Sequence, residues 1–163
     1  MRHSIAIIIV FFVLSADVAV RSAQAHFGMI IPSASMISAD EPRTVSLILS
    51  FAHPFEQKGM PLNRPRSFGV ITTQTSTSLL TQIKPIKRLG HSAWKFDFHV
   101  RRPGTYAFYM EPQPYWESAE DCFIIYHTKT VVAAFGDDEG WEDELGLKTE
   151  IVPVTRPFGL YTH

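Results

Sequence analysis

Residues 94–100 read Trp94-Lys95-Phe96-Asp97-Phe98-His99-Val100, so apolar and polar side chains alternate strictly along this stretch. A period of two is typical of a β-strand that has one face on a core and one face in water. Arg102-Pro103-Gly104 then supplies turn residues, and a second apolar run follows over 105–110. The order strand, turn, strand predicts a β-hairpin.

Other stretches have the same character, and no segment shows a sustained helical period. Apolar residues occupy alternate positions from Val45 to Phe51, and further short strands are predicted over 68–73, 122–127, 129–135 and 151–154. Several short strands with turn signals between them predict an all-β fold, an antiparallel immunoglobulin-like β-sandwich from about Thr44 to Val154. The expected core consists of Leu47, Leu49, Phe51, Trp94, Phe96, Phe98, Phe108 and Ile125.

The first 25 residues have the organisation of a secretory signal peptide. Arg2 precedes an apolar run from Ile5 to Leu14, and residues 23–25 read Ala-Gln-Ala, the small-x-small pattern of a cleavage site. The run is too short to span a bilayer, which takes about 20 residues. We therefore expect cleavage after Ala25, one periplasmic domain over 26–163, and no stable membrane insertion after cleavage.

The charge, the single cysteine and the absence of known motifs argue against several classes of function. The formal net charge is −1 and no basic stripe occurs, so we expect no nucleic-acid partner. Cys122 is the single cysteine, and its apolar surroundings predict a buried, inert thiol. Residues 137–144 carry six acids without the spacing of a calcium-binding loop, which favours a solvated loop. Because no hydrolase or phosphate-binding motif is present, we do not expect an enzyme.

His26 would become the first residue after cleavage. It would then offer a free α-amine and an imidazole, two nitrogen ligands in one chelate. Their reference pKa values, about 7.7–8.0 and about 6.5, let a metal ion displace the protons near neutral pH. The sequence therefore makes His26 a candidate metal ligand.

Two further histidines lie at the ends of predicted strands, on the side of the strand that carries the apolar residues. His53 is on the same side as Leu49 and Phe51, and His127 is on the same side as Phe123 and Ile125. Such positions suit either a metal ligand or a core histidine bonded to a backbone carbonyl. We predict that His26, His53 and His127 bind one metal ion within roughly 5 Å of one another. Acidic residues just before the last predicted strand could add a carboxylate ligand or orient an imidazole: Glu117, Glu120 and Asp121.

Several segments resemble the DUF4198 family, exported proteins described as periplasmic components of nickel and cobalt uptake systems. They are His26 to Ser33, Phe51 to Glu56, Pro112 to Glu117, Ile125 to Lys129, and Gly140-Trp141 leading to Pro157 to Tyr161. The resemblance implies a β-sandwich that binds a transition metal and serves a transporter, with His26, His53 and His127 at the matching positions. Family members usually continue beyond the last segment, so the resemblance also implies that a further portion is absent here.

The leading hypothesis is a periplasmic protein that binds Ni²⁺ or Co²⁺ for an inner- or outer-membrane metal transporter, with copper as a possible ion. One alternative is a copper-dependent oxidative enzyme with an N-terminal histidine chelate, for which Tyr115, Trp116 and Trp141 could form an aromatic surface. The other is an immunoglobulin-like interaction module without a metal.

Overall fold

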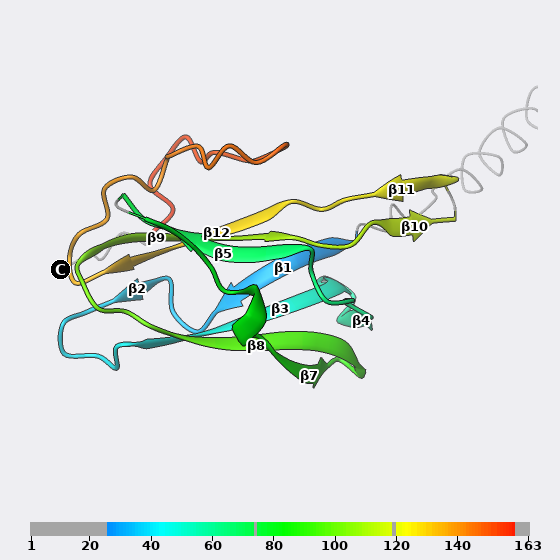
Figure 1. Cartoon of the computed structure of the whole chain (residues 1–163), viewed down its shortest axis with the longest axis horizontal. Coiled ribbons are helices and arrows are strands. Elements are labelled where there is room, and N and C mark those ends of the chain that lie inside the picture. Colours follow the sequence, from blue (N-terminus) through cyan, green and yellow to red (C-terminus); the bar gives the residue numbers. More distant parts are fainter. Residues whose placement is uncertain (1–25, 74, 119, 159–163) are drawn as a thin grey trace, which may run out of the picture.

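The computed structural model describes residues 26–73, 75–118 and 120–158, so the predicted signal peptide over 1–25 lies outside the described residues. Two β-sheets pack face to face, and a two-stranded hairpin extends from one end (Figure 1). The predicted all-β sandwich is therefore confirmed. No helix in this part of the chain is long and apolar enough to span a membrane.

The first sheet has the order β1-β3-β8-β7. Its strands are β1 (Phe27–Pro32), β3 (Thr44–His53), β8 (His91–His99) and β7 (Lys84–Arg88), with β4 (Lys58–Met60) paired to the end of β3. All of these pairs are antiparallel.

The second sheet has the order β2-β12-β9-β5-β6. Its strands are β2 (Met36–Ile37), β12 (Thr128–Ala134), β9 (Gly104–Glu111), β5 (Ser67–Ile71) and β6 (Ser76–Ser78). The hairpin consists of β10 (Tyr115–Glu117) and β11 (Cys122–Ile124), and a single 3-10 turn, η1 (Leu80–Gln82), follows β6.

The strand order is that of an immunoglobulin-like domain. The N-terminal part of the chain contributes a strand to each sheet. β1 pairs with β3 in the first sheet, and β2 pairs in parallel with β12 in the second. Tyr106, near the start of β9, donates a hydrogen bond of 2.8 Å from its hydroxyl to the carbonyl of Arg102. A tyrosine that bonds back to the chain at this corner is a feature of such sandwiches.

The predicted hairpin between residues 94 and 110 is wrong. Both strands form, but β8 pairs with β3 and β7, whereas β9 pairs with β12 and β5 in the other sheet. The Val100 N–H donates to the carbonyl of Arg43 (2.8 Å), and Tyr106 fixes Arg102. These bonds hold residues 100–106 as a connection from the first sheet to the second, instead of a tight turn within one sheet.

The sandwich core contains most of the predicted residues. Leu47, Leu49, Phe51 and Phe108 are buried. Trp94, Phe96 and Phe98 are half-buried and pack against that cluster. Ile125 is half-buried and lies outside it, because it follows the projecting hairpin.

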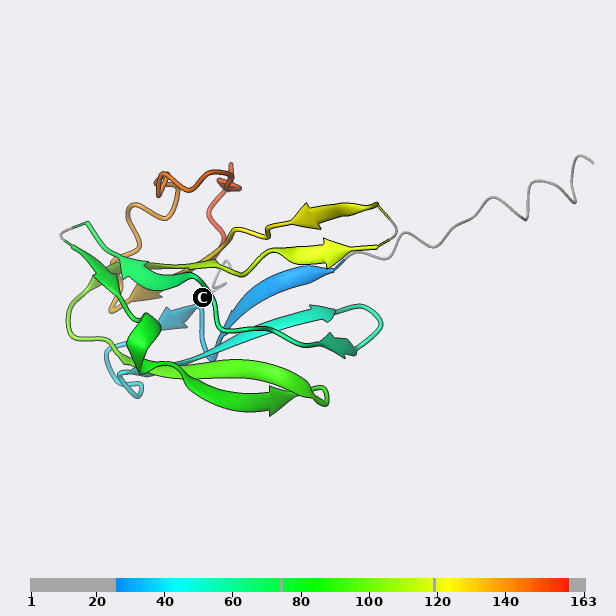
Figure 2. The same cartoon turned by 45° about the vertical axis from the view of Figure 1, so that its right-hand side comes forward.

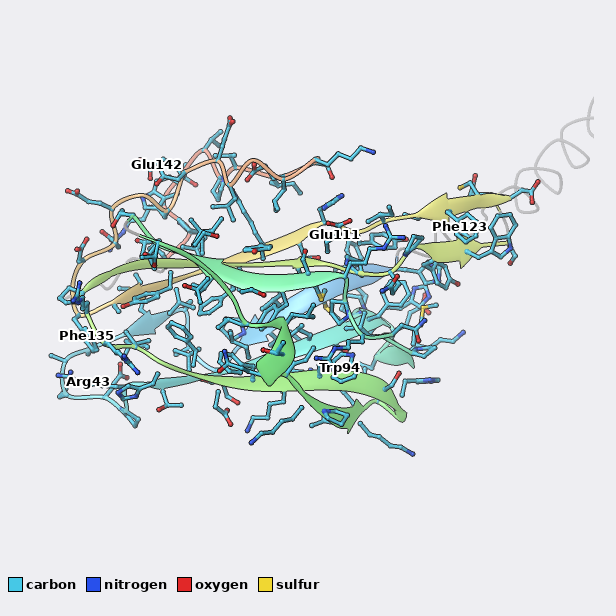
Figure 3. The ribbon with its side chains drawn as sticks, viewed as in Figure 1. Arg43, Trp94, Glu111, Phe123, Phe135 and Glu142 are labelled. Atoms are coloured by element: carbon cyan, nitrogen blue, oxygen red, sulfur yellow. The ribbon has the colours of Figure 1, made fainter. Side chains whose placement is uncertain are left out.

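Two predictions about the later part of the chain are also wrong. Residues 151–154 form no strand, and Ile151 and Val154 are 86% and 96% exposed. Cys122 is exposed, and Phe123 beside it is 67% exposed. Figure 3 shows Phe123 on the hairpin beyond the sandwich, where no opposing sheet covers its face.

The segment after β12 runs over the outer face of the second sheet (Figures 1 and 3), where Glu142 marks the acidic loop. Glu150 anchors it. The carboxylate pairs with Lys129 at 2.8 Å, and both side chains are nearly buried (11% and 8% exposed). It also accepts backbone N–H bonds from Leu145 and Gly146, each 3.0 Å long.

We expect Glu150→Gln to lower stability at neutral pH by about 1.5–3 kcal/mol, the usual value of hydrogen bonds to a charged group. Burial alone would raise the pKa of Glu150, but the Leu145 N–H and the Lys129 ammonium together bring the pKa below its ordinary value. The stabilisation by the ionised Glu150 carboxylate should thus be complete above the unfolded-state pKa of about 4.3. It should disappear as the pH falls through the lower pKa of Glu150 in the folded protein.

Urea unfolding at several pH values would measure both effects. In acid, the wild type and Glu150→Gln should converge. Asp138→Asn is the matched control, because Asp138 pairs with Arg156 in a more exposed setting and should change stability by less than about 1 kcal/mol. Equal losses for the two variants would contradict the anchoring role of Glu150.

Candidate metal centre

The pairing of β1 with β3 brings His26 beside His53. Phe27 lies opposite Ala52 in this ladder, so the residue before β1 meets the last residue of β3. The two imidazole centroids are 4.0 Å apart, with the ring planes at 49°. The fold thus brings His26 and His53 together, and their role as metal ligands stays a prediction.

Aromatic side chains enclose this histidine pair. His53 is only 4% exposed and the His26 side chain 13%. The His26 ring stacks on Phe51 at 5.8 Å and faces Tyr115 of β10 at 5.5 Å.

Glu117 adds a carboxylate at the edge of the pair. Its Oε2 lies 3.5 Å from Nδ1 of His26, and its side chain is 14% exposed. Burial lowers the pKa of His26 from its usual value, and the neighbouring His53 lowers it further, while Glu117 acts in the opposite direction. The net effect favours the neutral imidazole, which is the form that binds a metal ion.

Three aromatic side chains surround the histidine pair: Tyr115, Tyr126 and Phe51. The sequence did not predict Tyr126 or Phe51 as part of the site. Tyr126 packs on Phe51 at 5.5 Å, and burial raises the pKa of its hydroxyl. The spacing of Tyr115 and Glu117, two residues apart, could have indicated that both face His26 from one strand.

His127 is not brought to the pair. A Cβ on Gly28 would lie 3.3 Å from Cβ of Tyr126, and the Thr128 hydroxyl donates to the Gly28 carbonyl at 2.8 Å. Tyr126 and Thr128, on either side of His127 in the sequence, therefore contact β1, and no group of three metal-ligating side chains among the described residues includes His127. Its Nδ1 is buried without a hydrogen-bond partner. A role for His127 as a ligand stays a prediction.

The other predicted acidic ligands, Glu120 and Asp121, are exposed. His91 and His99, which were not expected to bind a metal, are exposed as well, and His163 lies outside the described residues. Within residues 26–73, 75–118 and 120–158, no three His, Cys, Asp or Glu side chains are arranged to hold a metal ion. Side chains alone thus supply an imidazole pair and a carboxylate near one member, and a complete site requires another donor.

Comparison with known proteins adds one finding. A family model described as a domain of unknown function, DUF4198, matches residues 23–163. No curated protein and no solved structure matches the chain.

Proposed function

The chain belongs to the DUF4198 family, since the family model covers residues 23–163, and from this premise we propose that it is an exported metal-binding protein. It would bind one Ni²⁺ or Co²⁺ ion in the periplasm and pass it to a membrane transporter. The family resemblance suggests the ions and the location.

The observation that carries the proposal is the buried His26–His53 pair, with ring centroids 4.0 Å apart and Glu117 at its edge. Imidazole nitrogens are common ligands of transition metals, so the pair would supply two donors of a metal site with nitrogen ligands. The free amine of a mature His26 would be the missing donor on the same residue.

The donor set fits ions that must be released again. Imidazole, amine and carboxylate groups suit nickel and cobalt, and copper would bind more tightly by the usual affinity order. Because Glu117 belongs to the projecting β10–β11 hairpin (Figure 2), the proposed site would lie at one end of the sandwich. An end position suits transfer to a second protein.

Native mass spectrometry of the protein recovered after export tests the proposal. We expect the mass of residues 26–163, and a gain of one nickel or cobalt ion after loading. A chain that begins at another residue would contradict the proposed chelate. A chain that begins at His26 and takes up no ion would favour the interaction module without a metal.

One observation favours a second candidate, the copper-dependent oxidative enzyme. Trp116 and Phe123 are 46% and 67% exposed and meet edge to face at 4.9 Å on the hairpin whose Tyr115 and Glu117 contact His26. An exposed aromatic surface beside a copper site is what such an enzyme needs. Reductant-dependent oxygen consumption by the copper-loaded protein would identify it, and its absence would leave the carrier function.

A further inference from the structure

A large hollow lies at the other end of the sandwich, between β8 and the β5–β6 hairpin. Thr44 starts β3 opposite His99 of β8, whereas His53 ends β3, so the hollow beside His99 is remote from the histidine pair. Its volume is about 570 Å³. Small-molecule sites typically measure roughly 300–1,000 Å³.

The floor of the hollow is apolar. Phe96 and Phe98 of β8 are half-buried there, and Phe98 packs edge to face on Phe108 at 5.1 Å. Val70, on the opposite sheet, is buried in the wall. Thr77 pairs with Val70 across the β5–β6 ladder and therefore shares its inward face. Phenylalanine rings left partly open at the base of a hollow offer a surface for an apolar ligand group.

The mouth of the hollow is positively charged. Arg101 is exposed and has no ion-pair partner among the described residues, and Arg102 lies beside it. The Tyr106 hydroxyl holds this segment, since it donates to the Arg102 carbonyl and accepts from the Arg102 N–H at 3.3 Å. The arginines therefore stand on a fixed corner of the fold.

The one carboxylate in the lining is already paired. Asp97 accepts a hydrogen bond of 2.7 Å from the Ser46 hydroxyl and lies 3.2 Å from the Lys95 ammonium. The Ser46 bond and Lys95 hold the pKa of Asp97 below its usual range, so it stays ionised and neutralised by Lys95. The charge left for a ligand is that of Arg101, which has no ion-pair partner among the described residues, and it favours an anion.

We propose that this hollow binds a small organic anion with an aromatic or acyl body. The body would rest on Phe96 and Phe98, and the anionic group would meet Arg101 at the mouth. This site is separate from the proposed metal centre and does not depend on it.

Titration of the exported protein with trans-cinnamate, followed by two-dimensional NMR, tests the proposal. Cinnamamide is the neutral probe of the same shape and should bind at least about tenfold more weakly. Arg101→Ala should weaken cinnamate binding by a similar factor. Lys87→Ala, which removes an exposed charge from β7 outside the hollow, should leave it unchanged.

Thr77→Phe provides a second variant, because residue 77 is exposed at the rim and a larger side chain there would fill the hollow without disturbing the core. It should abolish cinnamate binding while the circular dichroism spectrum stays that of the wild type. The proposal is wrong if cinnamate does not bind, if cinnamamide binds equally well, or if folded Thr77→Phe binds as the wild type does.

Discussion

His53→Ala should weaken nickel and cobalt binding by about a hundredfold or more. His53 is one of two imidazoles in the site, and a partner residue that only orients a ligand is already worth about 10–100-fold in metal affinity. The side chain is 4% exposed, so alanine leaves a cavity that water, a weaker ligand, can enter. Isothermal titration calorimetry of the protein that begins at His26 would measure the loss.

The control for this variant is His99→Ala. His99 ends β8 at the opposite end of the sandwich and is exposed, so its removal should alter neither the metal affinity nor the fold. Circular dichroism of both variants separates loss of a ligand from loss of structure. A folded His53→Ala protein with unchanged affinity would sink the proposed metal centre.

The histidine pair could be predicted from the sequence because its causes are local. The alternation of Val45, Leu47, Leu49 and Phe51 predicted the inward side of His53, and β3 is a central strand whose last five residues are all buried. His26 was identified by the cleavage pattern, without knowledge of β1. The register between β1 and β3 then places the two rings side by side.

His127 could not be placed in the same way, because its apparent parity belongs to another element. Phe123 lies on β11, in a hairpin that projects from the sandwich. The alternation of residues predicted that Phe123 points into the core, but its side of the hairpin is exposed. Residues 125–127 form no strand, and the alternation starts afresh at Thr128 of β12. Sequence alternation identifies a face only while one sheet continues.

The sequence predicted the wrong partners for β8 and β9 for a different reason. Turn residues at 102–104 suit a hairpin and a corner between sheets equally well, since both need a sharp change of direction. The distinction depends on Tyr106 and on the bond from Val100 to Arg43, which lies far away in sequence. Figure 3 shows Arg43 beside Phe135 at this end, and the guanidinium carbon lies 5.0 Å from the centre of the phenyl ring. Only the assembled fold brings these groups together.

A glycine inserted between Ala25 and His26 should weaken metal binding by roughly a hundredfold or more, provided that cleavage still follows Ala25. Every side chain is retained, but the α-amine moves by about 3.3–3.6 Å, one extended residue, and leaves its chelate with the His26 imidazole. Two donors linked on one residue gain about 10²–10⁴ in affinity over separate donors, and the insertion removes that advantage. Calorimetry against nickel, after mass spectrometry has verified the new terminus, would measure the change.

The matched control is a glycine added after His163, which lengthens the chain equally and should leave nickel affinity unaltered. The pair of insertions also tells the two nitrogen donors of His26 apart. If the N-terminal insertion has no effect while His53→Ala does, the metal is held by imidazoles and Glu117 without the amine. If the insertion alone weakens binding, the ion is held by the amine chelate of His26 without His53, and the metal centre proposed on the histidine pair is wrong. Loss in both variants is the result that the buried pair and the missing third donor predict.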